Sequence, residues 1–154
     1  MRRADGGPPL DAFETALRLL GQRAHSEAEL RRKLLGRGCP PEEIDRALTG
    51  ARRLGALDDA AFARALAGER SRSRGPALIA RELAAKGVER SVVAAAVGEV
   101  PREEVLAAAR RLAARAAAAG ADRRVVAARL VRRGFPSDVV REALDRGVEI
   151  DPEG

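Results

Sequence analysis

The sequence predicts an all-α protein made of three tandem three-helix repeats in an elongated, curved array. Of its 154 residues, 33 are Ala and 27 of the 29 basic residues are Arg, and both types are strong helix formers. Aromatic residues make up only 2%, and β-branched residues are also scarce, which argues against a sandwich, a barrel or a large α/β sheet. Gly and Pro interrupt the chain at short, regular intervals, so each predicted helix is short.

The first elements follow from capping residues. Residues 1–10 are rich in Gly and Pro and predict a disordered leader before a helix at 11–23. Ser26 and Glu29 form an S-x-x-E capping box, which predicts a helix starting at residue 27. Gly38 and its neighbourhood end that helix, and Pro41 is suited to the first turn of the next.

The remaining elements repeat this punctuation. Asp58 or Asp59 caps a helix just before Phe62, and this reading is preferred to a metal-binding or acid pair. Gly75 with the following proline ends that helix and opens another, and Gly87 ends the latter. Later Gly and Pro pairs divide the rest of the chain in the same way. The predicted helices are 11–23, 27–37, 41–53, 59–73, 76–86, 89–98, 102–119, 122–133 and 137–147.

An internal repeat becomes visible when Gly38, Gly87 and Gly134 are aligned. Apolar residues then share positions before and after the glycine, on one face of each flanking helix. The glycine falls where a left-handed helix end requires no Cβ. The alternative is coincidence in a chain rich in Ala and Leu. The aligned columns are Leu30, Ile79 and Val126; Leu34, Leu83 and Leu130; Cys39, Val88 and Phe135; Ile44, Val93 and Val140; and Leu48, Val97 and Leu144.

The repeat defines the expected domain organisation. Three-helix repeats are predicted at residues 11–54, 55–100 and 101–147, followed by an acidic tail at 148–154. Repeats this small bury little surface alone and need their neighbours. With few large side chains available, we expect a thin core with close, Ala-mediated contacts between helices.

Composition also limits the classes of function. The chain has one cysteine, Cys39, and one histidine, His25, which argues against a His/Cys metal site and a disulfide framework, and no cofactor is expected. We expect Cys39 to be a small buried hydrophobic residue and His25 to lie at the surface or beside a helix cap. The chain lacks a phosphate-binding G-x-x-x-x-G-K-[ST] loop, a catalytic constellation and any long apolar segment. These features predict a cytoplasmic, monomeric protein that is neither an enzyme nor embedded in a membrane.

The net charge of +6 predicts a polyanionic partner, either nucleic acid or an acidic protein surface, although a coding bias toward Arg would also raise the charge. Residues 101–137 contain nine Arg and three acidic residues, a net charge of +6, whereas residues 138–154 have a net charge of −4. Glu69 is the only acid near Arg70, Arg72 and Arg74 in the sequence that offsets their charge. In the second helix, Glu29 is expected to pair with Lys33. The candidate contact residues are Arg31, Arg32, Lys33, Arg70, Arg72, Arg74, Arg81, Lys86, Arg123, Arg124, Arg132 and Arg133.

Two stretches, residues 16–48 and 54–88, resemble the RecX family of recombination regulators. The third repeat resembles the family only through the aligned columns and Arg133-Gly134-Phe135, and His25 departs from the Arg more usual there. The resemblance rests on Ala16, Leu17, Leu20, Ser26, Glu29, Leu30, Lys33, Leu34, Gly38, Leu57, Asp58, Asp59, Phe62, Ala63, Arg70, Gly75, Pro76, Ile79, Glu82, Leu83, Lys86, Gly87 and Val88.

This resemblance implies three tandem helical repeats that bind the RecA recombinase filament on DNA. It further implies inhibition or modulation of recombinase and ATPase activities in DNA recombination, repair and the SOS response. An alternative from the residues themselves is a basic helical module that binds single- or double-stranded DNA directly. A helical adaptor with another partner is a third reading.

Overall fold

The computed structural model describes residues 11–145, and within that range it contains nine α-helices and no strands. The predicted leader and the acidic tail at 148–154 lie outside the described residues. The helices are α1 (Ala12–Gln22), α2 (Glu27–Gly36), α3 (Pro41–Arg53), α4 (Asp59–Arg70), α5 (Pro76–Ala85), α6 (Arg90–Gly98), α7 (Arg102–Ala118), α8 (Arg123–Arg132) and α9 (Ser137–Asp145).

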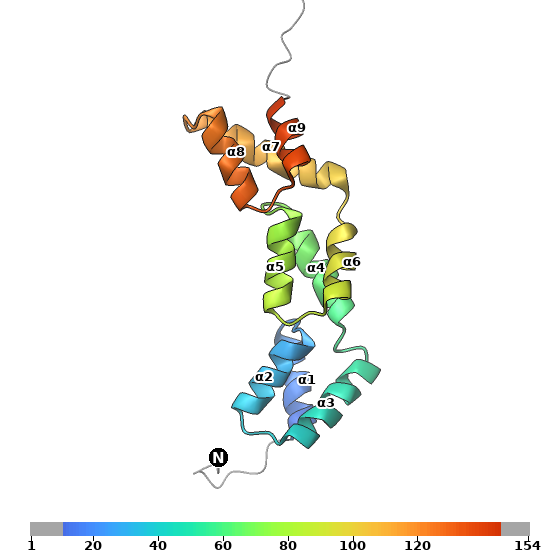
Figure 1. Ribbon diagram of the computed structural model, residues 1–154. Coiled ribbons are helices and arrows are strands. Elements are labelled where there is room, and N and C mark those ends of the chain that lie inside the picture. The colour runs from blue at the N-terminus through green and yellow to red at the C-terminus, as the bar shows by residue number, and fades with distance from the viewer. Residues whose placement is uncertain (1–10, 146–154) are drawn as a thin grey trace, which may run out of the picture.

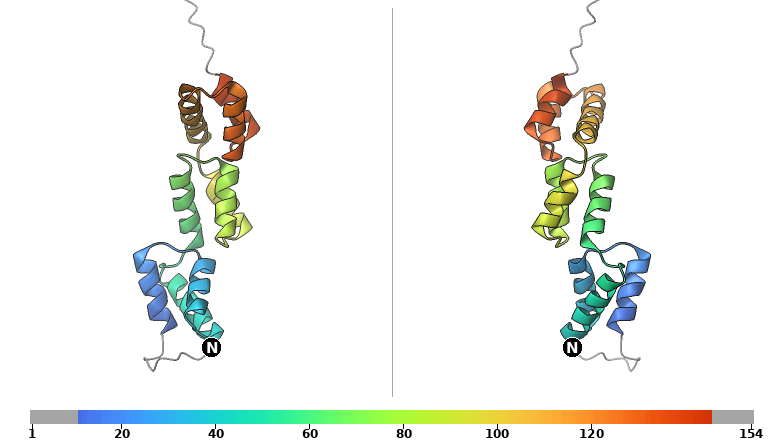
Figure 2. Two further views of the ribbon diagram at one scale, coloured as in Figure 1. Left: turned by 90° about the vertical axis from the view of Figure 1, so that its left-hand side faces the viewer. Right: turned by 90° about the vertical axis from the view of Figure 1, so that its right-hand side faces the viewer.

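The helices form three units stacked into an elongated molecule, as Figures 1 and 2 show. We call α1–α3 unit 1, α4–α6 unit 2 and α7–α9 unit 3. Each unit has its own cluster of buried apolar side chains, and the helix pairs that pack extensively all lie within one unit. Val100, in the link between α6 and α7, packs against the cores of both units 2 and 3. The all-α fold with tandem three-helix repeats is therefore confirmed.

Local capping explains where several helices begin. The Ser26 Oγ accepts a hydrogen bond from the Glu29 backbone N–H at 3.1 Å and so caps α2. The carboxylate of Asp58 caps α4 in the same way, and that of Asp122 caps α8. The two Asp caps add a negative charge where the helix dipole favours it. Of the two predicted caps of α4, Asp58 therefore fills the role.

The three aligned glycines have the predicted left-handed backbone. Their φ angles are +84° at Gly38, +77° at Gly87 and +91° at Gly134. The residues before and after them turn their apolar side chains into the core of each unit. In the first four aligned columns all three members are buried, whereas Val97 and Leu144 in the last column are partly buried.

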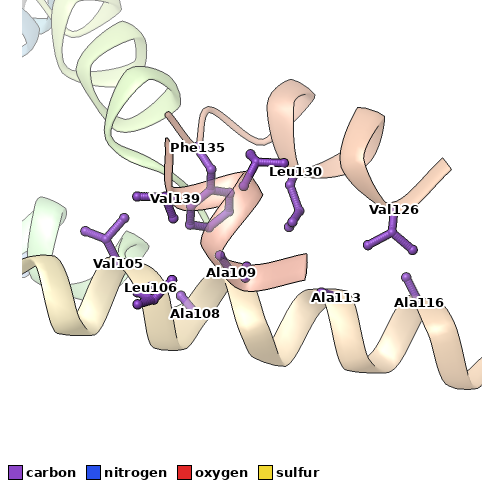
Figure 3. Close-up of a cluster of buried hydrophobic side chains, with 12 residues drawn as sticks. Val105, Leu106, Ala108, Ala109, Ala113, Ala116, Val126, Leu130, Phe135 and Val139 are labelled. Carbon is purple, nitrogen blue, oxygen red and sulfur yellow. The ribbon is translucent and has the colours of Figure 1, made fainter. Parts of the chain in front are cut away.

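Alanine side chains of α7 form one wall of the core of unit 3, as Figure 3 shows. Along α7, Ala109, Ala113 and Ala116 are buried and form a row of small side chains. Larger residues of α8 and the following turn, including Leu130 and Phe135, lie on the other side of this core. Buried alanines of α7 thus contribute to this core, as the composition predicts.

One local prediction was wrong, and a second was met only in part. The fourth helix ends at Arg70 and not at residue 73, because Ser71–Arg74 form turns in which the N–H groups of Ser73 and Arg74 both donate to the Arg70 carbonyl. His25 lies beside the helix cap Ser26, which was one of its two predicted places, but it is 2% exposed and so not at the surface, because residues at the start of α2 lie against unit 2. Cys39 is buried, as predicted.

Candidate interaction site

The joint between units 1 and 2 places the start of α2 against the end of α5. The Ser26 Oγ donates to the Lys86 carbonyl at 2.6 Å, and the Lys86 ammonium pairs with the Glu29 carboxylate at 3.2 Å. The Asp59 carboxylate accepts from the Glu27 backbone N–H at 2.8 Å, so this residue links units and does not cap its own helix. Burial raises the pKa of Asp59, because desolvation disfavours the charged carboxylate.

Around this joint, Glu29 and Lys33 do not pair with each other as the sequence predicts. Lys33 instead donates to the His25 Nε2 at 2.8 Å, and the His25 Nδ1 lies 2.8 Å from the Arg23 carbonyl. Burial lowers the pKa of His25, which fits a neutral ring that accepts a hydrogen bond from an ammonium. Desolvation acts to raise the pKa of Glu29, but hydrogen bonds from Arg23 and Lys86 outweigh it and lower that pKa.

The joint between units 2 and 3 is built mainly from backbone groups. The Gly75 N–H donates to the Arg133 carbonyl at 2.8 Å, and the Ala77 N–H donates to the Gly134 carbonyl at 3.1 Å. A Cβ on Gly75 would lie 2.3 Å from the Gly134 carbonyl carbon, so only glycine allows this approach. Arg111 and Arg133 add side-chain hydrogen bonds to carbonyls of the turn before Gly75, each at 3.2 Å.

Glu82 neutralises two of the predicted contact residues. Its carboxylate accepts from Arg70 at 3.0 Å and from Arg74 at 2.9 Å, and Glu69 also pairs with Arg70. The expectation that only Glu69 offsets this cluster was therefore wrong. The reason is that α5 returns along α4, which brings a carboxylate from 12 residues along the chain to Arg70.

Unit 3 separates its paired and unpaired charges. On one side, the α9 acids Asp138 and Glu142 bind Arg102, and Glu142 also lies 3.8 Å from Arg110. At the end of α9, the acid of residue 145 pairs with Arg123 at 2.9 Å. The acidic residues that pair with arginines of unit 3 thus lie on α9. Among the residues that the structure describes, the side of α8 that faces away from α9 has no such acidic partners and keeps its positive charge.

On that other side lies a cluster that we call the arginine groove: Arg74, Arg115, Arg129, Arg132 and Arg133. A hollow of about 700 Å³ is lined by four of these arginines together with Leu78. An adjoining hollow of about 180 Å³ lies between α7 and α8 and shares two of these arginines. Neither lining contains a carboxylate. The groove therefore offers guanidinium groups over an apolar floor, an arrangement suited to phosphate or carboxylate.

The arginines of the groove differ in whether they already form ion pairs or hydrogen bonds within the protein. Within residues 11–145, the side chains of Arg115, Arg129 and Arg132 make no ion pair or hydrogen bond, and all three residues are exposed. Arg74 pairs with Glu82, and Arg133 donates to a backbone carbonyl. Three full charges of the groove are thus available to a ligand.

The predicted contact residues do not form one surface. Arg31 pairs with Asp45 at 2.8 Å, while Arg32 and Arg81 are exposed on units 1 and 2. Sequence reasoning included Arg132 and Arg133 but omitted Arg115 and Arg129 from the site. The four-residue spacing of Arg129 and Arg133 on one helix face was a usable signal, whereas the position of Arg115 depends on how α7 crosses α8.

Within the described part of the chain, no helix is long and apolar enough to span a membrane, and no three His, Cys, Asp or Glu side chains gather as metal ligands. The fold and the groove together define a class: an all-helical, three-unit repeat protein with an arginine-lined groove between units 2 and 3. Residues 12–49 match the family description "RecX, first three-helix domain", and residues 58–97 match "RecX, second three-helix domain".

Relatives extend the match over most of the chain. Regulatory protein RecX of Halorhodospira halophila is 38% identical over 147 residues, covering 92% of this chain and 91% of that protein. Regulatory protein RecX of Thermus thermophilus is 40% identical over 133 residues, covering 86% and 89%. The crystal structure of RecX from Lactobacillus salivarius has a TM-score of 0.81 at 17% identity, covering 88% of this chain and 93% of that one, a likeness of fold. The chain belongs to the RecX family of regulatory proteins.

Proposed function

We propose that the chain is a non-enzymatic regulator that binds the RecA recombinase filament on DNA and inhibits or modulates its recombinase and ATPase activities. Family membership over most of the chain is the observation that carries this proposal. The elongated stack suits a partner that is itself extended, because successive units can contact successive positions along it. We further expect it to act as a cytoplasmic monomer in recombination, repair and the SOS response.

The arginine groove supplies a contact surface for such a complex. Its three unpaired guanidinium groups can meet acidic recombinase surface or the phosphates of the DNA that the filament holds. Bound along the filament, the protein would obstruct entry of homologous duplex or growth of the filament. The sequence-predicted residues Arg72 and Arg124 remain candidates for further contacts.

The test is recombinase ATPase on single-stranded DNA, and strand exchange, with increasing amounts of protein. We expect inhibition by the parent chain, and weaker inhibition by Arg129→Ala/Arg132→Ala. The matched control, Arg90→Ala/Arg141→Ala, removes two exposed arginines outside the groove. Unchanged ATPase and strand exchange at an excess of parent protein would contradict the proposed function.

A second candidate function, direct binding of nucleic acid, is favoured by the absence of carboxylates from the groove lining. Phosphate contacts release counterions, so affinity should fall steeply with salt. For a single strand, removing two phosphate contacts should reduce the slope of log K against log[salt] by about 1.4. Gel shifts without recombinase, across salt concentrations, compare the parent with Arg129→Ala/Arg132→Ala. Absence of a shift at low salt would exclude this function.

A further inference from the structure

The arginine groove is divided between two units that share little contact. Arg74 and Leu78 belong to the turn before α5 and to α5 itself, whereas Arg129, Arg132 and Arg133 belong to α8 and the residue after it. The lining of one hollow is thus complete only while units 2 and 3 keep their present arrangement. A ligand in this hollow would contact both units at once.

Few contacts hold units 2 and 3 in this arrangement. Units 2 and 3 have separate cores, with Val100 as the apolar residue that contacts both. Beyond the covalent link, the junction includes two backbone hydrogen bonds, the close approach of Gly134 to Gly75 and Leu78, and two arginine side chains that donate to carbonyls. Small, polar interfaces between units permit relative motion as the default.

The positive charge of the groove is concentrated on the unit 3 side. Arg129, Arg132 and Arg133 share that side of the lining, whereas Glu69 and Glu82 balance Arg70 and Arg74 on the unit 2 side. Like charges gathered at one helix end repel one another, and the repulsion weakens with distance and salt. An anion in the hollow would offset that repulsion and could also accept hydrogen bonds from the remaining N–H groups of Arg74 on the opposite side.

The chemistry of the lining favours a phosphate chain over other anions. Guanidinium groups match phosphate oxygens through paired N–H donors, and a nucleic-acid strand presents phosphates at a density that isolated carboxylates on a protein surface do not reach. The larger hollow is lined by arginines and Leu78, with no aromatic ring for base stacking and no amide for reading base edges. Such a lining would hold a strand by its backbone and without regard to sequence.

We propose that the arginine groove binds the phosphodiester backbone of a single nucleic-acid strand across the joint, and that occupancy locks units 2 and 3 in one relative orientation. This inference deepens the proposed function by giving its contact surface a ligand and a conformational consequence. The locked orientation sets the curvature of the array, and hence how the three units can follow an extended partner. The test below contains no recombinase, so its failure is distinguishable from failure of the proposed function.

The experiment measures the distance between spin labels on units 2 and 3. Ala65 in α4 and Ala118 in α7 are exposed and uncharged, so Ala65→Cys and Ala118→Cys place the labels without altering the charge. Cys39→Val removes the native thiol, because Val88 fills the equivalent buried position in unit 2. Distance distributions are recorded with and without an oligothymidylate, at low and at high salt.

We expect a broad distribution without ligand that narrows to one peak when the oligothymidylate is added at low salt. In an Arg129→Ala/Arg132→Ala background the narrowing should be lost, and in the Arg90→Ala/Arg141→Ala background it should persist. Circular dichroism of each variant checks that the helices remain. A distribution that is already narrow without ligand, or narrowing that persists in the groove variant, would overturn the proposal. Equal narrowing by polyglutamate would overturn its phosphate chemistry.

Discussion

Two equivalent glycines offer a direct test of how the units are joined. Gly38 and Gly87 both follow the second helix of a unit, and both have positive φ, +84° and +77°. A Cβ built on Gly38 meets nothing within 4 Å, whereas a Cβ on Gly87 would lie 2.3 Å from the Ala28 Cβ of unit 1. Alanine at Gly38 therefore brings backbone strain alone. Alanine at Gly87 brings the same strain and also pushes units 1 and 2 apart.

The two effects can be given magnitudes. The left-handed conformation costs a residue with a Cβ roughly 1–2 kcal/mol. Forcing an extra methyl group into a packed contact adds typically about 1–3 kcal/mol. We therefore expect Gly38→Ala to lower the free energy of unfolding by about 1–2 kcal/mol. For Gly87→Ala we expect a loss of about 2–5 kcal/mol.

The assay is urea unfolding of the full chain, followed by far-ultraviolet circular dichroism, with both variants compared at one temperature and salt concentration. A second substitution separates strain from collision, because Ala28→Gly removes the methyl group that Gly87→Ala would meet. By itself Ala28→Gly should cost about 0.5–1 kcal/mol, the usual penalty of glycine in a helix. In the Gly87→Ala background it should instead recover part of the loss. Equal losses for Gly38→Ala and Gly87→Ala, with no recovery, would refute this account of the joint.

Three further predictions concern charge, pH and packing. Glu82→Gln should tighten oligothymidylate binding, measured by fluorescence anisotropy, because it removes the negative charge that pairs with Arg74 beside the groove; weaker binding would contradict this. Because burial lowers the pKa of His25 from 6.5, the unfolded chain binds a proton that the folded protein resists, so the urea midpoint should fall as pH drops below that value. A His25→Gln variant should lack that part of the pH dependence, and parallel curves for both proteins would disprove it. Leu130→Ala should destabilise unit 3 by about 2–5 kcal/mol in urea unfolding, since this residue is only 1% exposed.

The helical architecture could be predicted because its signals are local. A glycine at a left-handed helix end, such as Gly38 or Gly134, acts through its own backbone and needs no tertiary information. The caps Ser26 and Asp122 also bond only to neighbouring N–H groups. The end of α4 was placed too late because residues 71–73 lack a glycine or proline, and a competing turn ends the helix first.

The candidate site was less predictable because its members come from different helices. The pairing of Glu82 with Arg70 depends on how α5 packs beside α4. Arg129 is unpaired among the described residues because the acids of α9 lie next to other arginines, such as Arg102. His25 shows the same limit, since its burial comes from contacts that the sequence around Ser26 does not reveal. Net charge indicated that a basic surface exists, but tertiary packing decides which arginines compose it.

The separate cores of the three units have a consequence for how the chain folds. The extensive helix contacts within the described residues join helices of one unit, so the stabilising contacts lie close together along the sequence. Chains with such local contacts fold quickly, since little loop-closure entropy is lost before the contacts form. The core of unit 1 uses residues from Ala12 to Leu57, which include the start of the link to unit 2, and it can pack before the later units have been synthesised. We therefore expect folding on the ribosome to proceed unit by unit, with each glycine joint closing as the next unit emerges.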